Sequence, residues 1–201
     1  MYIYSFLDYS ETKILRILNS ELADTLGNLL SRACAKTLNP QQIFPKLHKE
    51  EMRELLEMEV GKILVEKLAE LGEKCHQNYS VNNFHLVVDA VMSALHAANN
   101  FFESTKPWEL KKGNETQIRK LETIISITME ALKISGIILQ PIIPNMTCNL
   151  LNRLNVPEKE RSWKYTTLML RQKSLSLKDL ESNILFKRII LEEKPTNKRK
   201  V

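Results

Sequence analysis

Apolar residues return at intervals of three and four along the first part of the chain, a spacing that places them on one face of an α-helix. Within residues 11–37 the apolar positions are Ile14, Leu18, Leu22, Leu26, Leu29 and Ala33. Ser10 precedes them and suits a helix cap, because its side chain can accept a hydrogen bond from a free amide of the first turn. The pattern predicts an amphipathic helix that ends before Asn39-Pro40, since the residue before a proline is disfavoured in helical conformation.

Three more long segments show the same periodicity. They cover residues 48–75, 80–104 and 115–140. We expect Ser80 to cap the second of these segments and Asn114 to open the third, which Pro141 ends. A shorter helix over residues 145–154 is expected after Pro144, because proline is favoured in the first turn of a helix.

Four long helices joined by short links predict an all-α fold, an antiparallel helical bundle with a short C-terminal appendage. Composition agrees, because the chain has five glycines, seven prolines and 43% apolar residues, enough for a core and too few turn residues for a β fold. We expect one domain over residues 1–190, with short elements around Leu168 and residues 184–190. Residues 191–201 are basic and polar and are expected to form a disordered tail.

Composition also narrows the class of protein. No stretch approaches the roughly 20 apolar residues that a membrane span needs, so we expect no membrane partner. The cysteines Cys34, Cys75 and Cys148 are odd in number and far apart, which argues against a disulfide framework. The first residues carry no basic run of a secretory or mitochondrial import signal. A net charge of +5 favours polyanionic partners without identifying one.

The sequence contains no Gly-rich phosphate loop, metalloprotease histidine pair or nucleophile elbow. Cys75-His76 is the nearest approach to a metal site, but adjacent residues on a helix point about 100° apart. His48, His85 and His96 are isolated, and such histidines are far more often packed or at helix ends than general bases. We therefore expect no catalytic residue and no metal site in this chain.

Two local features suit nucleic-acid recognition. Asn28 and Arg32 lie one helical turn apart, so they project from one face as an amide beside a cationic fork, a pair that can read base edges. Trp108 follows Pro107 directly after a helix, where the proline would hold the indole at a corner on which an unstacked base could lie. On spacing alone, the more common interpretation is a helix-surface contact for the first pair and simple packing at a bundle end for the tryptophan.

Several segments resemble the anticodon-binding domain of methionyl-tRNA synthetases. Residues 21–32, ELADTLGNLLSR, are similar to the first helix of that domain, where a leucine-glycine-asparagine run leads to an arginine. Residues 98–102, ANNFF, and 106–111, KPWELK, resemble its alanine-asparagine-x-aromatic segment and its proline-tryptophan corner. Residues 139–144, LQPIIP, resemble the turn before its last bundle helix, and residues 184–189, ILFKRI, its closing strand-like segment. The likeness is to the bacterial-type enzymes, and among these to the animal mitochondrial form.

This resemblance implies recognition of the CAU anticodon of methionine tRNA, with bases turned out of the loop and read one by one. Asn28 and Arg32 would hydrogen-bond the first anticodon base, and Trp108, placed by Pro107, would stack against it. Two lysines would hold phosphates without adding specificity: Lys111 and Lys112.

The resemblance also implies that a catalytic domain precedes this one. In the family that domain binds ATP, with Mg, and charges tRNA with methionine, but its histidine-glycine signature and its lysine-serine loop do not occur in this sequence. We therefore expect no cofactor in this chain, no ligase activity from it alone, and the catalytic domain of the same enzyme as a partner. We further expect a monomer in the mitochondrial matrix, with the cytoplasm as the alternative location.

A second departure lies near the end of the chain, where Phe186-Lys187 replaces a phenylalanine followed by proline. An alternative hypothesis is that the chain is a non-catalytic helical protein-interaction scaffold or an inactive truncated product. The scaffold would show an exposed apolar patch around Asn28 and Trp108.

Overall fold

The structure is a computed structural model that describes residues 10–169, 172–179 and 184–190. Its longer helices are α1 Glu11–Leu18, η1 Asn19–Gly27, α2 Asn28–Ala33, α3 Lys49–Glu57, α4 Glu59–Ser80, α5 Phe84–Thr105, α7 Glu115–Leu139 and α8 Pro144–Arg153. The short elements are α6 Pro107–Leu110, η2 Glu158–Glu160, η3 Trp163–Tyr165, β1 Ile43–Phe44 and β2 Leu175–Ser176. The predicted all-α bundle is confirmed. The expected tail, residues 191–201, lies outside the described residues.

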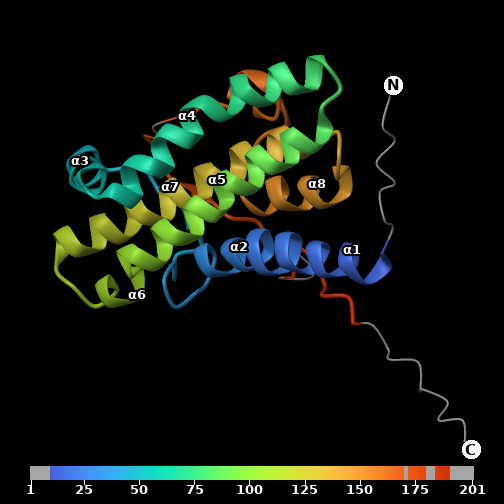
Figure 1. Ribbon diagram of the computed structural model, residues 1–201. Helices are drawn as coiled ribbons and strands as arrows, with labels where there is room; N and C mark the ends of the chain where they lie inside the picture. The colour runs from blue at the N-terminus through green and yellow to red at the C-terminus, as the bar shows by residue number, and fades with distance from the viewer. Residues whose placement is uncertain (1–9, 170–171, 180–183, 191–201) are drawn as a thin grey trace, which may run out of the picture.

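Helix α7 forms the centre of the bundle (Figure 1). Its residues from Thr123 to Leu139 are buried on every side of the helix, because helices α5, α8, α2, α3 and α4 all pack against it. In Figure 1, α4 and α5 lie side by side, and the helix made of α1, η1 and α2 runs along the lower edge of the view. No helix in the described part of the chain is both long and apolar enough to cross a membrane.

The predicted first helix is confirmed as a continuous run from α1 through η1 to α2, although it ends at Ala33 rather than near residue 37. Ser10 caps it, since its hydroxyl accepts a hydrogen bond from the amide of Lys13 at 3.4 Å. The middle section η1 is a π-helix, in which the amide of Asn28 donates to the carbonyl of Ala23, five residues back. Ile14, which the apolar stripe placed in the core, lies before this section and is 41% exposed, and α1 has no buried residue.

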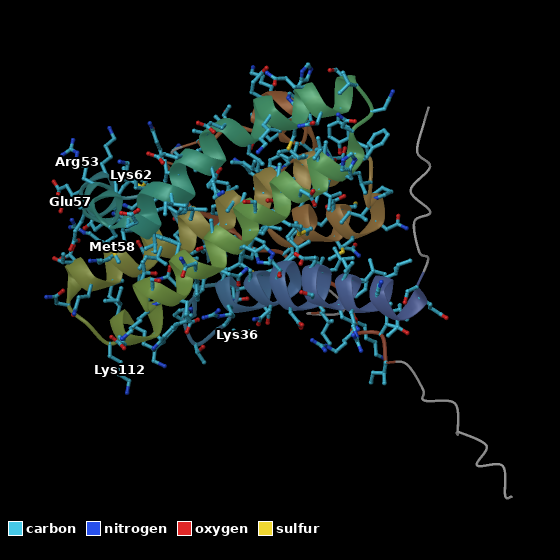
Figure 2. All side chains as sticks on the ribbon, viewed as in Figure 1. Lys36, Arg53, Glu57, Met58, Lys62 and Lys112 are labelled. Atoms are coloured by element: carbon cyan, nitrogen blue, oxygen red, sulfur yellow. The ribbon has the colours of Figure 1, made fainter. Side chains whose placement is uncertain are left out.

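The predicted helix over residues 48–75 is wrong in one respect, because it is two helices. Met58 has an extended backbone (φ −77°, ψ 133°) that ends α3 and starts α4 at a corner. A side chain at Gly61 would place its Cβ 2.0 Å from the carbonyl oxygen of Leu55, so this close approach requires glycine. Figure 2 labels Met58 at this corner, at the outer end of the bundle.

The cap predicted at Ser80 is also wrong. Helix α4 continues to Ser80, whose hydroxyl donates to the carbonyl of Gln77 at 2.7 Å, and α5 begins at Phe84. Asn114 caps α7 as expected, through reciprocal hydrogen bonds with Gln117 at 3.0 Å. The ends expected at the prolines are confirmed, because α7 stops at Leu139 and α8 begins at Pro144.

The residues after α8 pack against earlier elements of the chain, and the sequence indicated these contacts only coarsely. β2 pairs antiparallel with β1, Ile43 opposite Ser176 and Phe44 opposite Leu175. No helix or strand lies at Leu168, contrary to expectation.

Residues 184–190, called here the C-terminal strap, form no strand and lie against the first helix. The Asn19 amide donates to the carbonyl of Ile189 at 2.8 Å and accepts from its backbone amide at 2.9 Å. Arg188 pairs with Asp24 on the same helix. The strap therefore docks on this helix even though Lys187 stands where the family resemblance suggests proline.

Candidate nucleic-acid interface

Arg32 and Trp108, which the sequence analysis singled out separately, meet at one end of the bundle. The guanidinium carbon of Arg32, in α2, lies 4.8 Å from the centroid of the Phe102 ring and 5.9 Å from that of Trp108. Its Nη2 donates to Oε2 of Glu103 at 2.5 Å. Cation–π contacts and an ion pair thus hold the guanidinium plane between α5 and α6.

The Pro107 corner sets the position of the indole. Lys106 ends α5 in a left-handed conformation (φ 44°, ψ 57°), and Pro107 is buried as the first residue of α6. Trp108 packs against the core yet is only half-buried. Arg32 is likewise 28% exposed. Both residues are therefore partly accessible from solvent.

Asn28 lies one turn before Arg32 on the same helix and is exposed. No hydrogen bond to its side-chain amide is found within the described residues. Asn28 lines an open pocket of about 520 Å³ between the first helix and the C-terminal strap. Among the described residues, Trp108 is not part of the lining of this pocket. The structure thus joins Arg32 with Trp108 and places Asn28 at the border of a neighbouring groove.

The two lysines proposed for phosphate contacts follow α6. Lys111 and Lys112 are both exposed, and Figure 2 shows Lys112 and Lys36 projecting outward along the lower edge of the bundle, near α6 and the end of α2. Lys111 lines a pocket together with Thr37, so the chain after α2 adjoins the end of α6. These exposed lysines could bind phosphates.

Phe102 and Glu103 complete the site and were missed as functional residues. Phe102 belongs to the quoted segment of residues 98–102, but its ring is buried and reads as core from the sequence. Glu103 lies on an exposed helix face, where a carboxylate usually contacts only solvent. Their contacts with Arg32 join positions 70 and 71 residues apart, which local spacing does not reveal.

Two histidines contact other side chains of the bundle. His76 packs against Trp163, with ring centroids 5.6 Å apart, while the neighbouring Cys75 is buried in the core. His48 pairs with Glu122 at 2.6 Å. In the ranges that the structure describes, no group of three or more histidine, cysteine or acidic side chains is arranged to hold a metal ion.

The cysteines differ in their expected reactivity. Burial raises the pKa of Cys34 to about 11, although Arg153 lowers it in part, and burial also raises the pKa of Cys75 to about 11. Cys148 is exposed. Because the thiolate is the reactive form, an alkylating reagent at neutral pH should modify Cys148 first and the other two only after unfolding. Mass spectrometry of the modified peptides measures this order, and early alkylation of Cys34 would contradict the described burial.

Comparison with known proteins identifies the family. A family model described as the anticodon-binding domain of tRNA ligase matches residues 61–194. The matched range contains Pro107, Trp108 and the C-terminal strap, whereas Asn28 and Arg32 precede it.

Two similar proteins are both named as mitochondrial methionine-tRNA ligases. The mitochondrial methionine-tRNA ligase of Takifugu rubripes is 34% identical over 160 residues, 78% of this chain and 27% of that protein. The mitochondrial methionine-tRNA ligase of Homo sapiens is 31% identical over 167 residues, 77% of this chain and 28% of that protein. The chain therefore spans about a quarter of the length of these curated relatives.

A solved structure shows the same fold. The free form of methionyl-tRNA synthetase from Mycobacterium tuberculosis superposes with a TM-score of 0.77 at 23% identity, over 92% of this chain and 36% of that one. The resemblance drawn from the sequence motifs is thereby confirmed. The chain belongs to the family of anticodon-binding domains of tRNA ligases, and the relatives that it resembles within that family are methionine-tRNA ligases.

Proposed function

We propose that this chain recognises the CAU anticodon of methionine tRNA as the C-terminal part of a methionine-tRNA ligase. The observation that carries the proposal is the meeting of Arg32 with Trp108 at a solvent-facing end of the bundle. RNA loops are read through unstacked bases that lie on aromatic rings and accept hydrogen bonds from guanidinium groups. Both groups are present here on separate rigid helices.

Each residue has a defined task in this proposal. The first anticodon base, cytosine, stacks on the exposed part of Trp108, which Pro107 holds in place. Arg32 uses one terminal nitrogen on Glu103, and within the described residues its other N–H groups have no hydrogen-bond partner, so they can donate to the acceptors on the cytosine edge. Asn28, one helical turn before Arg32 at the border of the neighbouring groove, would hydrogen-bond the same base. Lys111 and Lys112 bind phosphates nonspecifically.

The chemistry of aminoacylation lies outside this interface. We assign ATP, Mg and methionine to the catalytic domain of the intact ligase. That catalytic domain would be the partner of the present domain within the same enzyme. Anticodon contact would then position the acceptor end of the tRNA over that domain. Because the curated relatives are named mitochondrial, we further propose a monomeric enzyme of the mitochondrial matrix, with the cytoplasm as the alternative.

The scaffold alternative has less support. It requires an exposed apolar patch around Asn28 and Trp108, whereas Asn28 is itself exposed and polar, and the exposed residues beside Trp108 along the chain are polar or charged: Glu103, Ser104, Lys106, Glu109 and Lys111. An apolar protein partner would leave these charges unpaired on binding, at a free-energy cost.

A binding titration tests the proposal. The full chain is titrated at fixed ionic strength with an anticodon stem-loop RNA carrying CAU and with stem-loops in which the cytosine is replaced by uracil or guanine. We expect CAU to bind about 10-fold tighter, the discrimination that one well-made base contact gives. Equal affinity for the three RNAs would refute anticodon recognition, whatever the strength of binding.

A further inference from the structure

A groove of about 450 Å³ lies between the first helix and α5, and its lining contains none of the residues assigned to RNA contact. Its apolar lining comes from Ile17, Val88 and Met92, and its acidic groups are Glu21 and Asp89. Ile17 is 61% exposed and Asp89 is exposed, so the groove is open to solvent. We call it the α5 groove.

The two carboxylates of the α5 groove have room for a further donor. Oε2 of Glu21 is shielded from water and accepts no hydrogen bond among the described residues, although Nε2 of His96 lies 3.1 Å away. Asp89 is exposed at the edge of the groove. Lys67 donates to Ser93 of the same groove at 2.9 Å, so one ammonium group accompanies two carboxylates. Because shielded carboxylate oxygens normally accept hydrogen bonds, the groove favours an additional cation.

Apolar walls beside carboxylates suit a long basic side chain. The methylene stem of an arginine or lysine packs on apolar surface while its charged head stays among polar groups. Ile17, Val88 and Met92 provide the apolar surface for the stem, and Glu21 and Asp89 provide acceptors for the head. A guanidinium suits two carboxylates better than an ammonium group does, because its five N–H groups project in a fixed plane.

The C-terminal strap brings the end of the chain to the same helix. Asn19 binds the backbone of Ile189 through both atoms of its amide, at 2.8 and 2.9 Å. Asn19 lies between Ile17 and Glu21 in the sequence of the first helix, and residues two apart on a helix point to nearly opposite sides. A segment that leaves the strap therefore reaches the α5 groove by following half the circumference of a helix roughly 11 Å wide, a path of about 17 Å.

The tail, residues 191–201, has the length and the charge for this path. Residues 191–197 span up to about 23 Å, since an extended chain advances about 3.3 Å per residue. They are followed by three consecutive cations, Lys198, Arg199 and Lys200. We propose that this basic run occupies the α5 groove of its own chain, with the guanidinium of Arg199 between Glu21 and Asp89.

In this arrangement the strap and the tail hold the first helix from two sides. Support from outside the bundle matters at α1, because none of its residues is buried. The same helix carries Arg32, so the tail steadies the RNA site without contacting RNA. The inference does not rest on the proposed function, because it concerns the free chain.

Cross-linking of carboxylates to amines by a carbodiimide tests the proposal. The reagent leaves no spacer, so it joins only groups in contact, and mass spectrometry of the digested full chain identifies the joined peptides. We expect Lys198 or Lys200 to be joined to Glu21 or Asp89. Glu66→Gln, which changes an exposed carboxylate of α4 outside the groove, is the matched control and should leave these cross-links unchanged.

An equal mixture of isotope-labelled and unlabelled chain identifies the occupant. Cross-links within one molecule join two labelled or two unlabelled peptides, which is the expected result. If peptides of mixed label are as frequent as random pairing predicts, the tail of a second copy occupies the groove and the proposal is overturned.

Charge removal measures what the contact contributes. Lys198→Gln, Arg199→Gln and Lys200→Gln together should speed hydrogen exchange of the α1 amides about 2- to 5-fold, the effect of one or two partly exposed ion pairs. Glu21→Gln with Asp89→Asn should act alike, and the two sets combined should add little, because they remove the same contact. Lys194→Gln, in the part of the tail that only spans the helix, is the matched control and should exchange like the unaltered chain.

Two further results would overturn the proposal. One is cross-linking of the tail to the acidic residues of α3 in place of the α5 groove. The other is unchanged exchange of the α1 amides when the three tail cations are replaced.

Discussion

Replacement of Arg32 or Trp108 by alanine is expected to remove most of the preference for CAU over other anticodons. Each change should cost about 1–3 kcal/mol of binding free energy for the CAU loop, and much less for a loop whose first base is changed. In the proposed binding mode both side chains touch the base, whereas the lysines hold the phosphate backbone. Titration of each variant with the CAU loop and with the loop whose cytosine is replaced measures the difference.

Two matched controls accompany these variants. Glu109→Ala removes an exposed charge from α6, beside Trp108, and should keep the preference. Lys111→Ala removes a proposed phosphate contact and should weaken all loops alike, with a reduced dependence on salt. A Trp108→Ala chain that still discriminates as well as the unaltered one would leave Trp108 as a packing residue.

Lys133→Ala is expected to have the largest effect on folding. Lys133 and Glu130 form an ion pair inside α7, with side chains 3% and 0% exposed. Removal of the ammonium group breaks a buried ion pair by taking away one of its two charges, which typically costs about 3–5 kcal/mol. The free energy of unfolding in urea, with an unchanged slope against denaturant, measures this loss.

Lys62→Ala is the control for that measurement. Lys62 pairs with Glu66 on α4 at 4.0 Å, but both side chains are more than half exposed. An exposed pair of this kind contributes roughly 0–1 kcal/mol. Equal losses for Lys133→Ala and Lys62→Ala would mean that the α7 pair is accessible to water in the folded protein.

Periodicity predicted the helices because their stability comes from one apolar stripe facing a common core. It missed the corner at Met58, since no proline marks the break and the apolar series runs through it. The sequence signal was Gly61, a residue with low helix propensity inside a helical pattern, whose reason is the approach of the Leu55 carbonyl. The pairing of β1 with β2 involves two residues on each side, too few for a period-two pattern to appear.

The site was predictable in part for a similar reason. Spacing made Arg32 and Trp108 candidates, because one lies on a regular helix and the other at a proline corner, and the family resemblance selected them. Glu103 and Phe102 become meaningful only when α2 lies against the end of α5, which is a tertiary contact. The groove beside Asn28 likewise depends on the C-terminal strap, and the sequence around Phe186 suggested a strand instead.

The stacking of cytosine on Trp108 can be measured directly by fluorescence. The chain has two tryptophans, so Trp163→Phe leaves Trp108 as the sole indole reporter. At saturation, the CAU loop should quench this emission, while the loop without the cytosine base, once bound to saturation, should leave it nearly unchanged. Equal quenching by both RNAs, or none by the CAU loop at saturation, would contradict the account.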